Sequence, residues 1–272
     1  DPFAGTPPLA ALRLLLSEAC SRGAKCSRAT FKVIDVTKAF LYGKMDRTLY
    51  IELPPEDQWA ASGEWVGLLK HTMYGTRDAP AAWQKVLGNV MTKLGFTTCK
   101  SVPCLYVQRD IGAVVHVDDF FVSGEAPKLL WFETELKREF SIKTENLGPG
   151  PEYVQEVKFL NRTIRWLETG MEIEGDEKHS QILVKEWCLE NAKECTTPGV
   201  KASKPDEKAG ENEIVPMTPE EATKFRRGVA RIVYLAQDRV DMAFCSKELA
   251  KKMARPSVGD EEALKRDIRY LK

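Results

Sequence analysis

Three aspartates are the residues of this 272-residue chain most suited to catalysis. Asp118 and Asp119 are adjacent between two apolar runs in residues 113–124, a pattern that predicts a β-hairpin with the acid pair at its tip. Asp35 lies near the end of another apolar run, residues 31–36. Neighbouring carboxylates repel each other, and partly buried ones need a cation. One acid at a strand end and two at a hairpin tip suit a two-metal phosphoryl-transfer site.

These acids also have a structural explanation. The aspartate side chain accepts hydrogen bonds from nearby backbone N–H groups, so aspartate is common in turns, and Asp35 alone would be an ordinary strand-end residue. The occurrence of all three acids in these contexts favours the catalytic hypothesis.

The composition excludes several classes of protein. A hydrophobic fraction of 43% and a charged fraction of 29% are typical of a globular protein, and no apolar run reaches membrane-spanning length, so no membrane partner is expected. Seven cysteines without a Cys-x-x-Cys pair, together with three histidines, argue against a zinc site. The odd cysteine count and the absence of a signal pattern predict an intracellular protein. Because the chain begins without Met, we expect it to be a fragment or a cleaved piece.

Charge is distributed unevenly along the chain. The net charge is zero, which argues against a nucleic-acid-binding protein, because such proteins usually carry a basic surface. Residues 222–272, however, contain thirteen Lys and Arg against seven Asp and Glu, a net charge of +6. The C-terminal part therefore remains a candidate for nucleic-acid binding.

The hydrophobic pattern predicts a mixed α and β region followed by an all-helical end. Helices are expected where apolar residues recur at helical spacing, and strands where short apolar runs are bounded by turn residues. The predicted helices span residues 6–23, 79–94, 129–140 and 182–192, and the predicted strands span 31–36, 50–55, 105–108, 113–117, 120–122, 153–166 and 171–173.

A polar segment separates these elements from the helical end. Residues 196–216 are rich in Pro, Gly, Lys and Glu, which predicts a linker. After the linker, Thr218 and Glu221 form a capping box that predicts the start of a helix. Two further helices are predicted over residues 242–253 and 261–271.

Six sequence blocks, in order, point to one family. Because each block alone is weak evidence, their shared order along nearly the whole chain carries the argument. The chain resembles the reverse transcriptase of copia-type (Ty1/copia, Pseudoviridae-like) LTR retrotransposons. The blocks are residues 35–43, similar to the first polymerase motif; 69–83, similar to "LYGLKQAPRAW"; 116–119, where the family has Tyr-Val-Asp-Asp; 159–161, where it has Phe-Leu-Gly; 225–244, similar to "YR…G…YL…RPDIA"; and 268–272, similar to "RYLKG".

The resemblance implies an α+β fold and a polymerase activity. It implies a right-hand polymerase with partial fingers and palm in residues 1–165, a palm–thumb connection and polar linker in 166–217, and a helical thumb in 218–272. The implied reaction is RNA-directed DNA synthesis by two-metal nucleotidyl transfer, with Mg²⁺, or Mn²⁺ in its place, and dNTPs. The implied partners are an RNA template, a DNA primer, their RNA/DNA hybrid, and the RNase H and integrase domains of a retrotransposon polyprotein, in a cytoplasmic particle or the nucleus.

The same resemblance assigns roles to the acids and their neighbours. Asp35 and Asp118 are expected to bridge two Mg²⁺ ions, Asp119 to support one of them, and the carbonyl of Val36 to add a ligand. Phe40 matches the steric-gate position that excludes a ribonucleotide 2′-OH, although a Phe here could equally be an ordinary core residue.

Two residues are expected next to the incoming nucleotide. By the resemblance, Tyr74 and Gly75 lie under the incoming base and the template, while the plain alternative is that Tyr74 packs on the palm. Arg77 and Asp78 depart from the Lys-Gln of the family, which leaves the contacts of this segment open.

Two further departures concern the primer. His116 replaces a Tyr that faces the primer end in the family; a His can still stack and donate a hydrogen bond, or it can be a partly buried neutral side chain. Asn161 replaces the Gly of the primer-grip turn, and Asn is the residue that best tolerates positive φ after Gly.

Basic side chains are expected on the first thumb helix. The resemblance places Arg226, Arg227, Arg231 and Tyr234 along the minor groove of the duplex, where arginine–phosphate contacts would give salt-dependent affinity. The alternative is a solvated basic helix face.

Two other functions remain open from the sequence. The chain could be a degenerate retroelement relic that keeps the acids without polymerising alone. It could also be a non-catalytic module that binds nucleic acid or protein.

Overall fold

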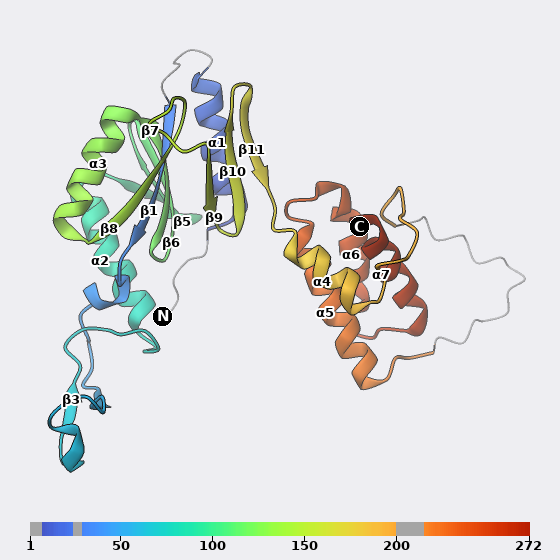
Figure 1. Cartoon of the computed structure of the whole chain (residues 1–272), viewed down its shortest axis with the longest axis horizontal. Coiled ribbons are helices and arrows are strands. Elements are labelled where there is room, and N and C mark those ends of the chain that lie inside the picture. Colours follow the sequence, from blue (N-terminus) through green and yellow to red (C-terminus); the bar gives the residue numbers. More distant parts are fainter. Residues whose placement is uncertain (1–6, 24–28, 200–214) are drawn as a thin grey trace, which may run out of the picture. The chain divides into compact units, whose positions relative to one another are not determined.

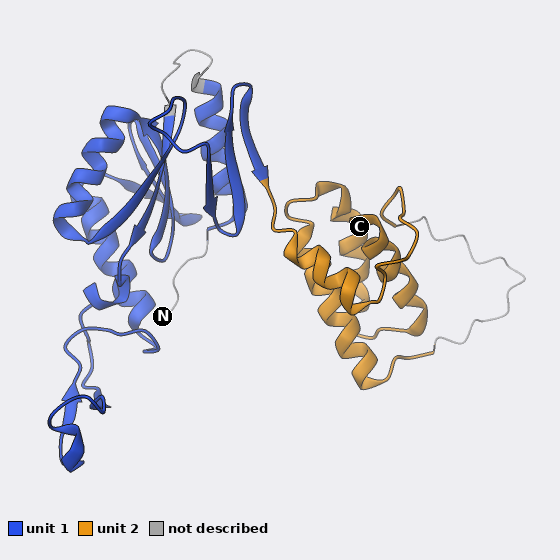
Figure 2. Cartoon of the chain, in the orientation of Figure 1, with its two compact units in different colours: residues 1–173 blue, residues 174–272 orange. Residues whose placement is uncertain are grey.

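The chain folds into two compact units, residues 1–173 and 174–272 (Figures 1 and 2). The computed structural model describes residues 7–23, 29–199 and 215–272. The division into fingers and palm, connection and thumb, expected at residues 165 and 217, stays a prediction. No helix among the described residues is both long and apolar enough to span a membrane.

An antiparallel six-stranded sheet forms the centre of unit 1. The strand order is β4-β5-β6-β7-β1-β8, so the two strands that carry the aspartates, β1 and β7, are neighbours. The mixed α+β fold class predicted from sequence is confirmed. The strands are β1 (Ala29–Val36), β4 (Thr97–Cys99), β5 (Val102–Gln108), β6 (Ile111–His116), β7 (Asp119–Glu125) and β8 (Ile142–Leu147).

The sheet has a core on each face because its central strands are apolar on both sides. In β1, Ile34 and Val36 pack on one face with helices α2 (Ala79–Lys93) and α3 (Ala126–Glu139). Alternate residues point to opposite faces of a strand, so Phe31 and Val33 pack on the other face. That face is covered by α1 (Leu9–Gly23) and by a small sheet of β9 (Glu156–Phe159), β10 (Arg162–Leu167) and β11 (Gly170–Glu174) (Figure 1).

A buried ion pair joins β1 to α3 on the face of the sheet that α2 and α3 cover. Lys32 is 4% exposed and donates a hydrogen bond to Glu133, which also accepts from Lys137 (2.7 Å) and Thr144 (3.1 Å). Burial alone would raise the pKa of Glu133, but the hydrogen bonds from Lys137 and Lys32 outweigh it and lower that pKa to about 2. The charge on this face of β1 is thus neutralised within the protein.

The remaining elements of unit 1 connect β1 to α2. A 3₁₀ helix η1 (Ala39–Tyr42) follows β1, and a hairpin of β2 (Tyr50–Glu52) and β3 (Val66–Leu68), with η2 (Ala60–Ser62) between them, extends beyond the main sheet (Figure 1). The chain returns to the sheet through Thr72, whose side chain donates to the Phe40 carbonyl (2.5 Å). A Cβ on Gly43 would lie 2.6 Å from the Thr72 hydroxyl oxygen, so the close approach of these loops requires glycine there.

Unit 2 is a bundle of helices around its own apolar core. The capping box at Thr218 and Glu221 is confirmed, and it begins helix α5 (Pro219–Leu235). The helix predicted over residues 182–192 is observed over Lys178–Glu186; it ends earlier than predicted because Cys188, just after its end, adopts a left-handed φ of 53°. Most of the predicted linker, residues 200–214, lies outside the described residues. The elements are α4 (Lys178–Glu186), α5 (Pro219–Leu235), η3 (Val240–Met242), α6 (Ala243–Lys252) and α7 (Val258–Leu271).

Two of the sequence blocks meet in unit 2. Arg239 donates two hydrogen bonds to Asp241 (3.1 and 2.7 Å), and the Tyr270 hydroxyl donates to the same carboxylate (2.5 Å). These contacts join the turn before α6 to the end of α7, so residues of both sequence blocks stabilise the fold of unit 2.

Candidate active site

The three aspartates meet at one end of the β1–β7 pair. Asp35 and Asp119 are directly opposite each other in the antiparallel ladder. The backbone N–H of Val36 donates to the carbonyl of Asp118 (3.0 Å), which fixes the hairpin tip against the end of β1. Asp35 and Asp119 alternate with Ile34 and Phe120 of the helix-side core, so both belong to the opposite face of the sheet. The structure therefore brings together the acids that the sequence selected.

The acids are close enough to perturb each other and a neighbouring tyrosine. The pKa of Asp119 is raised by burial and by the negative charges of Asp118 and Asp35, with His116 acting in the opposite direction. The pKa of Tyr74 is also raised, first by partial desolvation and then by the negative charges of Asp118 and Asp35. Excess negative charge at this edge of the sheet attracts cations.

The tip of the β6–β7 hairpin has a strained backbone and is hydrogen-bonded to α2. Only Val117 and Asp118 separate the paired residues His116 and Asp119. Val117 has a φ of 55°, a conformation that β-branched residues rarely adopt. Its carbonyl accepts a 2.6 Å hydrogen bond from the indole N–H of Trp83, which is 1% exposed in α2. Trp83 thus positions the acid pair, a role that sequence reasoning missed.

Two aromatic rings pack together close to the acids. The rings of Phe40, in η1, and Tyr74 are 4.8 Å apart between centroids. Phe40 is half-buried against the helix-side core, whereas Tyr74 is exposed. Gly75 has a φ of 92°, which an L side chain rarely adopts, and it leaves the backbone beside Tyr74 uncovered.

The two departures from the family motifs fit their local backbone. His116 ends β6 opposite Asp119, and its buried Nδ1 has no hydrogen-bond partner among the residues that the structure describes. Asn161 has a φ of 58° in the turn between β9 and β10, after Leu160 at 51°. The expectation that Asn would tolerate positive φ at this turn is confirmed, while the roles of both residues toward a primer stay predictions.

A cavity of about 510 Å³ opens directly beside Asp35. It lies between β1, β8 and β9, and Lys143 is the β8 residue opposite Asp35 in the ladder. Lys158 of β9 also lines this cavity, together with Glu145 and Glu156. Charged residues of both signs therefore line the cavity beside Asp35, and the sequence analysis selected none of these four residues.

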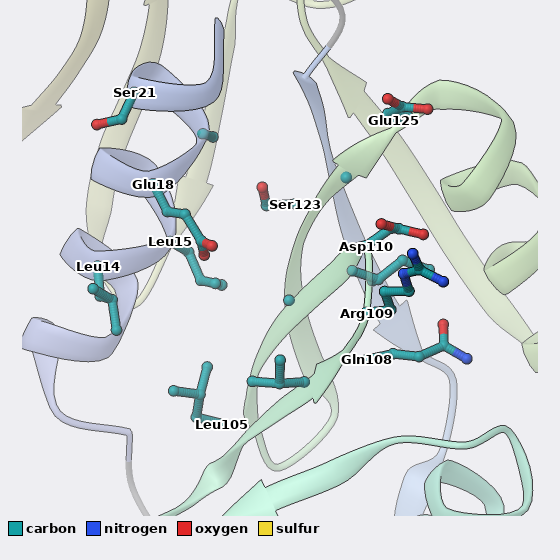
Figure 3. Close-up of a pocket in the computed structure, with 15 residues that line it drawn as sticks. Leu14, Leu15, Glu18, Ser21, Leu105, Gln108, Arg109, Asp110, Ser123 and Glu125 are labelled. Carbon is teal, nitrogen blue, oxygen red and sulfur yellow. The ribbon is translucent and has the colours of Figure 1, made fainter. Parts of the chain in front are cut away.

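A second cavity of about 510 Å³ lies at the other end of the same strands (Figure 3). It is formed by α1 and the strands β5 to β7, with Glu18, Asp110 and Glu125 around a largely aliphatic wall. The β6–β7 ladder runs from Ile111 and Gly124 at this end to His116 and Asp119 at the other. This cavity is therefore separate from the acids.

The basic residues expected on the thumb helix lie on α5 and have contacts within unit 2. Arg226 donates to the Met253 carbonyl (2.7 Å), while Arg227 and Arg231 approach Glu186 of α4 at 4.0 and 3.7 Å. Glu186 thus offsets part of the positive charge of α5. In addition, Tyr234 packs edge-on against the ring of His179, with 4.7 Å between the centroids.

The acids fit divalent magnesium by their chemistry. Among the described residues, no group of three or more His, Cys, Asp or Glu side chains forms a set that could hold a metal ion. Mg²⁺ seldom uses such all-protein cages; it is usually bound by one or two carboxylates together with waters and substrate phosphates. Aspartates that offer only oxygen ligands, with Asp35 at the edge of a cavity, match that preference, which Mn²⁺ shares.

Comparison with known proteins identifies the family. The family described as "Reverse transcriptase (RNA-dependent DNA polymerase)" matches residues 3–201, well over half of the chain. The chain belongs to this reverse transcriptase family. The resemblance inferred from the six sequence blocks is confirmed, because the curated relatives are copia-type retrotransposon polyproteins.

Three relatives illustrate the relationship. The chain is 29% identical to the "Retrovirus-related Pol polyprotein from transposon RE1" of Arabidopsis thaliana, over 88% of this chain and 16% of the relative. It is 25% identical to the corresponding polyprotein from transposon TNT 1-94 of Nicotiana tabacum, over 99% of this chain and 20% of the relative. A putative transposon Ty5-1 protein of Saccharomyces cerevisiae is 26% identical over 88% of this chain and 75% of that protein. The chain thus spans about a fifth or less of the two plant polyproteins.

Solved structures give a more distant likeness. Apo telomerase from Candida tropicalis matches with a TM-score of 0.38 and 9% identity, over 63% of this chain and 40% of that one. Telomerase from Candida albicans in complex with a telomeric RNA fragment matches with a TM-score of 0.37 and 9% identity, over 70% and 40%.

Proposed function

We propose that this reverse transcriptase family member is the nucleotidyl-transfer part of a retrotransposon RNA-directed DNA polymerase. One observation carries the proposal: Asp35 and Asp119 are opposite each other in the β1–β7 ladder, and Asp118 adjoins them at the strained hairpin tip. Each residue alone has an ordinary structural explanation. Together they concentrate negative charge at one end of the β1–β7 pair, and Asp35 lines a cavity there, which suits a two-metal reaction.

The acids would act as the metal-holding groups. Asp35 and Asp118 are the proposed ligands of two Mg²⁺ or Mn²⁺ ions, with Asp119 in support and the Val36 carbonyl as an additional ligand. Such ions, when bound, activate a primer 3′-OH and neutralise charge on the triphosphate. The hydrogen bonds of Val36 and Trp83 hold the tip that carries the acids, which reduces the reorganisation needed for binding.

The neighbouring side chains would position the nucleotide and the primer. Phe40, fixed against Tyr74, is the proposed steric gate toward a 2′-OH, and Tyr74 with Gly75 is the proposed surface beneath the incoming base and template. His116 at the hairpin and Asn161 in the β9–β10 turn are the proposed contacts to the primer end.

The substrates and partners follow from the same proposal. They are an RNA template, a DNA primer and their hybrid, dNTPs, and the RNase H and integrase domains of a polyprotein, in an intracellular particle or the nucleus. Arg226, Arg227, Arg231 and Tyr234 of α5 are the proposed duplex contacts. Because Arg227 and Arg231 lie near Glu186, we expect each to contribute less than a fully free arginine.

Primer extension on an RNA template with Mg²⁺ tests this function. Asp118→Asn should reduce extension by at least about 10³-fold, because it removes a charge that stabilises the transition state through the metals. Asp110→Asn is the matched control, since it makes the same change in the β5–β6 turn, at the other end of β6 from the acids. Equal extension by the Asp118→Asn variant would contradict the proposal, and an inactive parent chain that still binds the hybrid would favour the relic hypothesis.

A further inference from the structure

The hairpin formed by β2 and β3 carries exposed apolar side chains that no function described so far uses. It extends beyond the main sheet of unit 1 (Figure 1). Single exposed apolar residues are ordinary on a protein surface, but several of them gathered on one small element mark an interaction site. The hairpin has five large ones, each between 53% and 58% exposed: Tyr50, Trp59, Trp65, Val66 and Leu68.

The strand register places three of these side chains on one face of the hairpin. Tyr50 is directly opposite Leu68, and Val66 lies two residues before Leu68 in β3. Because alternate residues of a strand point to opposite faces, all three share one face. On the other face, Gly67 is packed so closely that an added Cβ would lie 3.3 Å from the side chain of Ile51. The first face is therefore the one that is left uncovered.

Two tryptophans lie at the end of the hairpin. Trp65 directly precedes β3, and its ring centroid is 5.7 Å from that of Trp59. Although the two rings pack together, each stays more than half exposed. Tryptophan is enriched at the energetic centres of protein interfaces, because its large ring buries much apolar area there.

The hairpin is also incomplete as a sheet. Among the described residues it is two-stranded, so β2 and β3 each have one outer edge without a neighbouring strand. Isolated two-stranded hairpins are marginally stable in water and gain stability from a third strand. Pro54 and Pro55 follow β2 and lack the N–H groups that pairing needs, so the outer edge of β3 is the better place for a third strand.

The charge of the hairpin selects the kind of partner. Residues 48–69 contain four acidic residues and no Lys or Arg, a net charge of −4. Among the described residues none of the four has an ion-pair partner. Such a surface repels the phosphates of nucleic acids and of anionic lipids, and it attracts cationic side chains. The four acids are Glu52, Glu56, Asp57 and Glu64.

We propose that the β2–β3 hairpin binds a basic protein segment in extended conformation, which adds as a third strand at the outer edge of β3. In strand addition, main-chain hydrogen bonds supply affinity and the alternating side chains supply specificity. Apolar side chains of the added strand lie beside Val66 and Leu68, and its Lys or Arg side chains reach the acids of the hairpin. This interaction goes beyond the polymerase function, because it uses none of the residues assigned to that function.

Two fluorescein-labelled decapeptides test the proposal by fluorescence anisotropy with the whole chain. The probe alternates Lys with Val, and the control peptide alternates Lys with Ser, which keeps the charge and removes the apolar side chains. We expect the Lys-Val peptide to bind at least about tenfold more tightly, because burying two valine side chains exceeds the free energy of a tenfold change. A third peptide that alternates Glu with Val should not bind, because the hairpin would repel it.

A matched pair of variants locates the binding on the hairpin. Leu68→Lys should weaken binding of the Lys-Val peptide by about tenfold or more, because it places a cation on the uncovered face. Leu130→Lys is the control, since Leu130 is an exposed leucine on α3. Melting temperatures verify that both variants are folded. Hydrogen exchange over Val66–Leu68 should slow when the peptide binds, because new main-chain hydrogen bonds form there.

Several results would overturn the proposal. They are equal affinity for the Lys-Val and Lys-Ser peptides, unchanged binding by Leu68→Lys, and slower exchange outside the hairpin alone. Slower exchange of β3 caused by a 12-nucleotide RNA, by anionic vesicles or by a raised concentration of the chain itself would identify a different occupant and overturn it as well. None of these measurements requires primer extension, so their outcome is separate from that of the proposed function.

Discussion

Charged side chains on the two faces of β1 differ in whether the protein neutralises them. On the face covered by α2 and α3, Lys32 pairs with Glu133 inside the protein, and Lys137 and Thr144 also donate hydrogen bonds to Glu133. On the other face, three residues later, Asp35 meets Asp119 across the ladder, and among the described residues none of the three site aspartates has an ion-pair partner. The first arrangement lowers a carboxyl pKa, and the second raises one.

This difference separates stability from function. Charge that is neutralised within the chain needs nothing from solution, and breaking such a pair is destabilising. Charge that is left uncompensated at a cavity destabilises the free protein slightly and marks a place where a ligand can bind. The comparison predicts that carboxylates on the two faces respond oppositely to mutation.

The largest expected effect on stability is at the neutralised face. Glu133→Gln should lower the free energy of unfolding by about 3 kcal/mol, because it leaves Lys32 buried without an anion. Asp119→Asn should raise it by about 1 kcal/mol in the absence of divalent ions, because it relieves repulsion. Urea unfolding in EDTA measures both values, and destabilisation by both variants to the same extent would abolish the distinction.

The pH dependence of stability sharpens the same comparison. Since Glu133 has its pKa lowered to about 2, its contribution is fully present above the unfolded value of 4.5 and is lost as the pH falls from 4.5 toward 2. That difference corresponds to about 3 kcal/mol. Unfolding measured between pH 6 and 2 should show this loss in the parent and not in Glu133→Gln. A parallel pH profile for the two proteins would place the acid sensitivity elsewhere.

A smaller effect is expected on nucleic-acid binding by α5, where Glu186 partly offsets the charge of the arginines. Replacing Arg226, Arg227 and Arg231 together with Ala should reduce the salt slope of RNA/DNA hybrid binding by up to about 0.9 per lost phosphate contact. The nearby Glu186 should keep the total below three full contacts. Anisotropy titrations at several salt concentrations give the slope, and Lys272→Ala serves as a basic control outside α5. An unchanged slope would mean that these arginines only stabilise unit 2.

Sequence reasoning found the residues whose signal is local. Asp118 and Asp119 sit between two short apolar runs, and the capping box at Thr218 lies within four residues, so each pattern could be read directly. The α+β order followed from the same periodicity. The family resemblance added Phe40 and Tyr74, whose proximity the structure shows.

The features that it missed depend on contacts between distant residues. Lys32 and Glu133 are 101 positions apart, and a lysine within a strand gives no sign of its partner. The bond from Trp83 to Val117 and the pairing of Arg231 with Glu186 likewise arise only when separate elements pack. Buried polar partners are chosen by the tertiary fold, which short-range patterns do not encode.

The pKa of the Asp119 carboxyl, followed by ¹³C NMR with and without Mg²⁺, tests the central claim most directly. Without the ion, burial and the charges of Asp118 and Asp35 should hold this pKa above the ordinary value of 3.8. With saturating Mg²⁺, the bound charge should lower it below that value, and Asp118→Asn should weaken the response. A pKa that does not change with Mg²⁺ would show that the aspartates do not form a metal site.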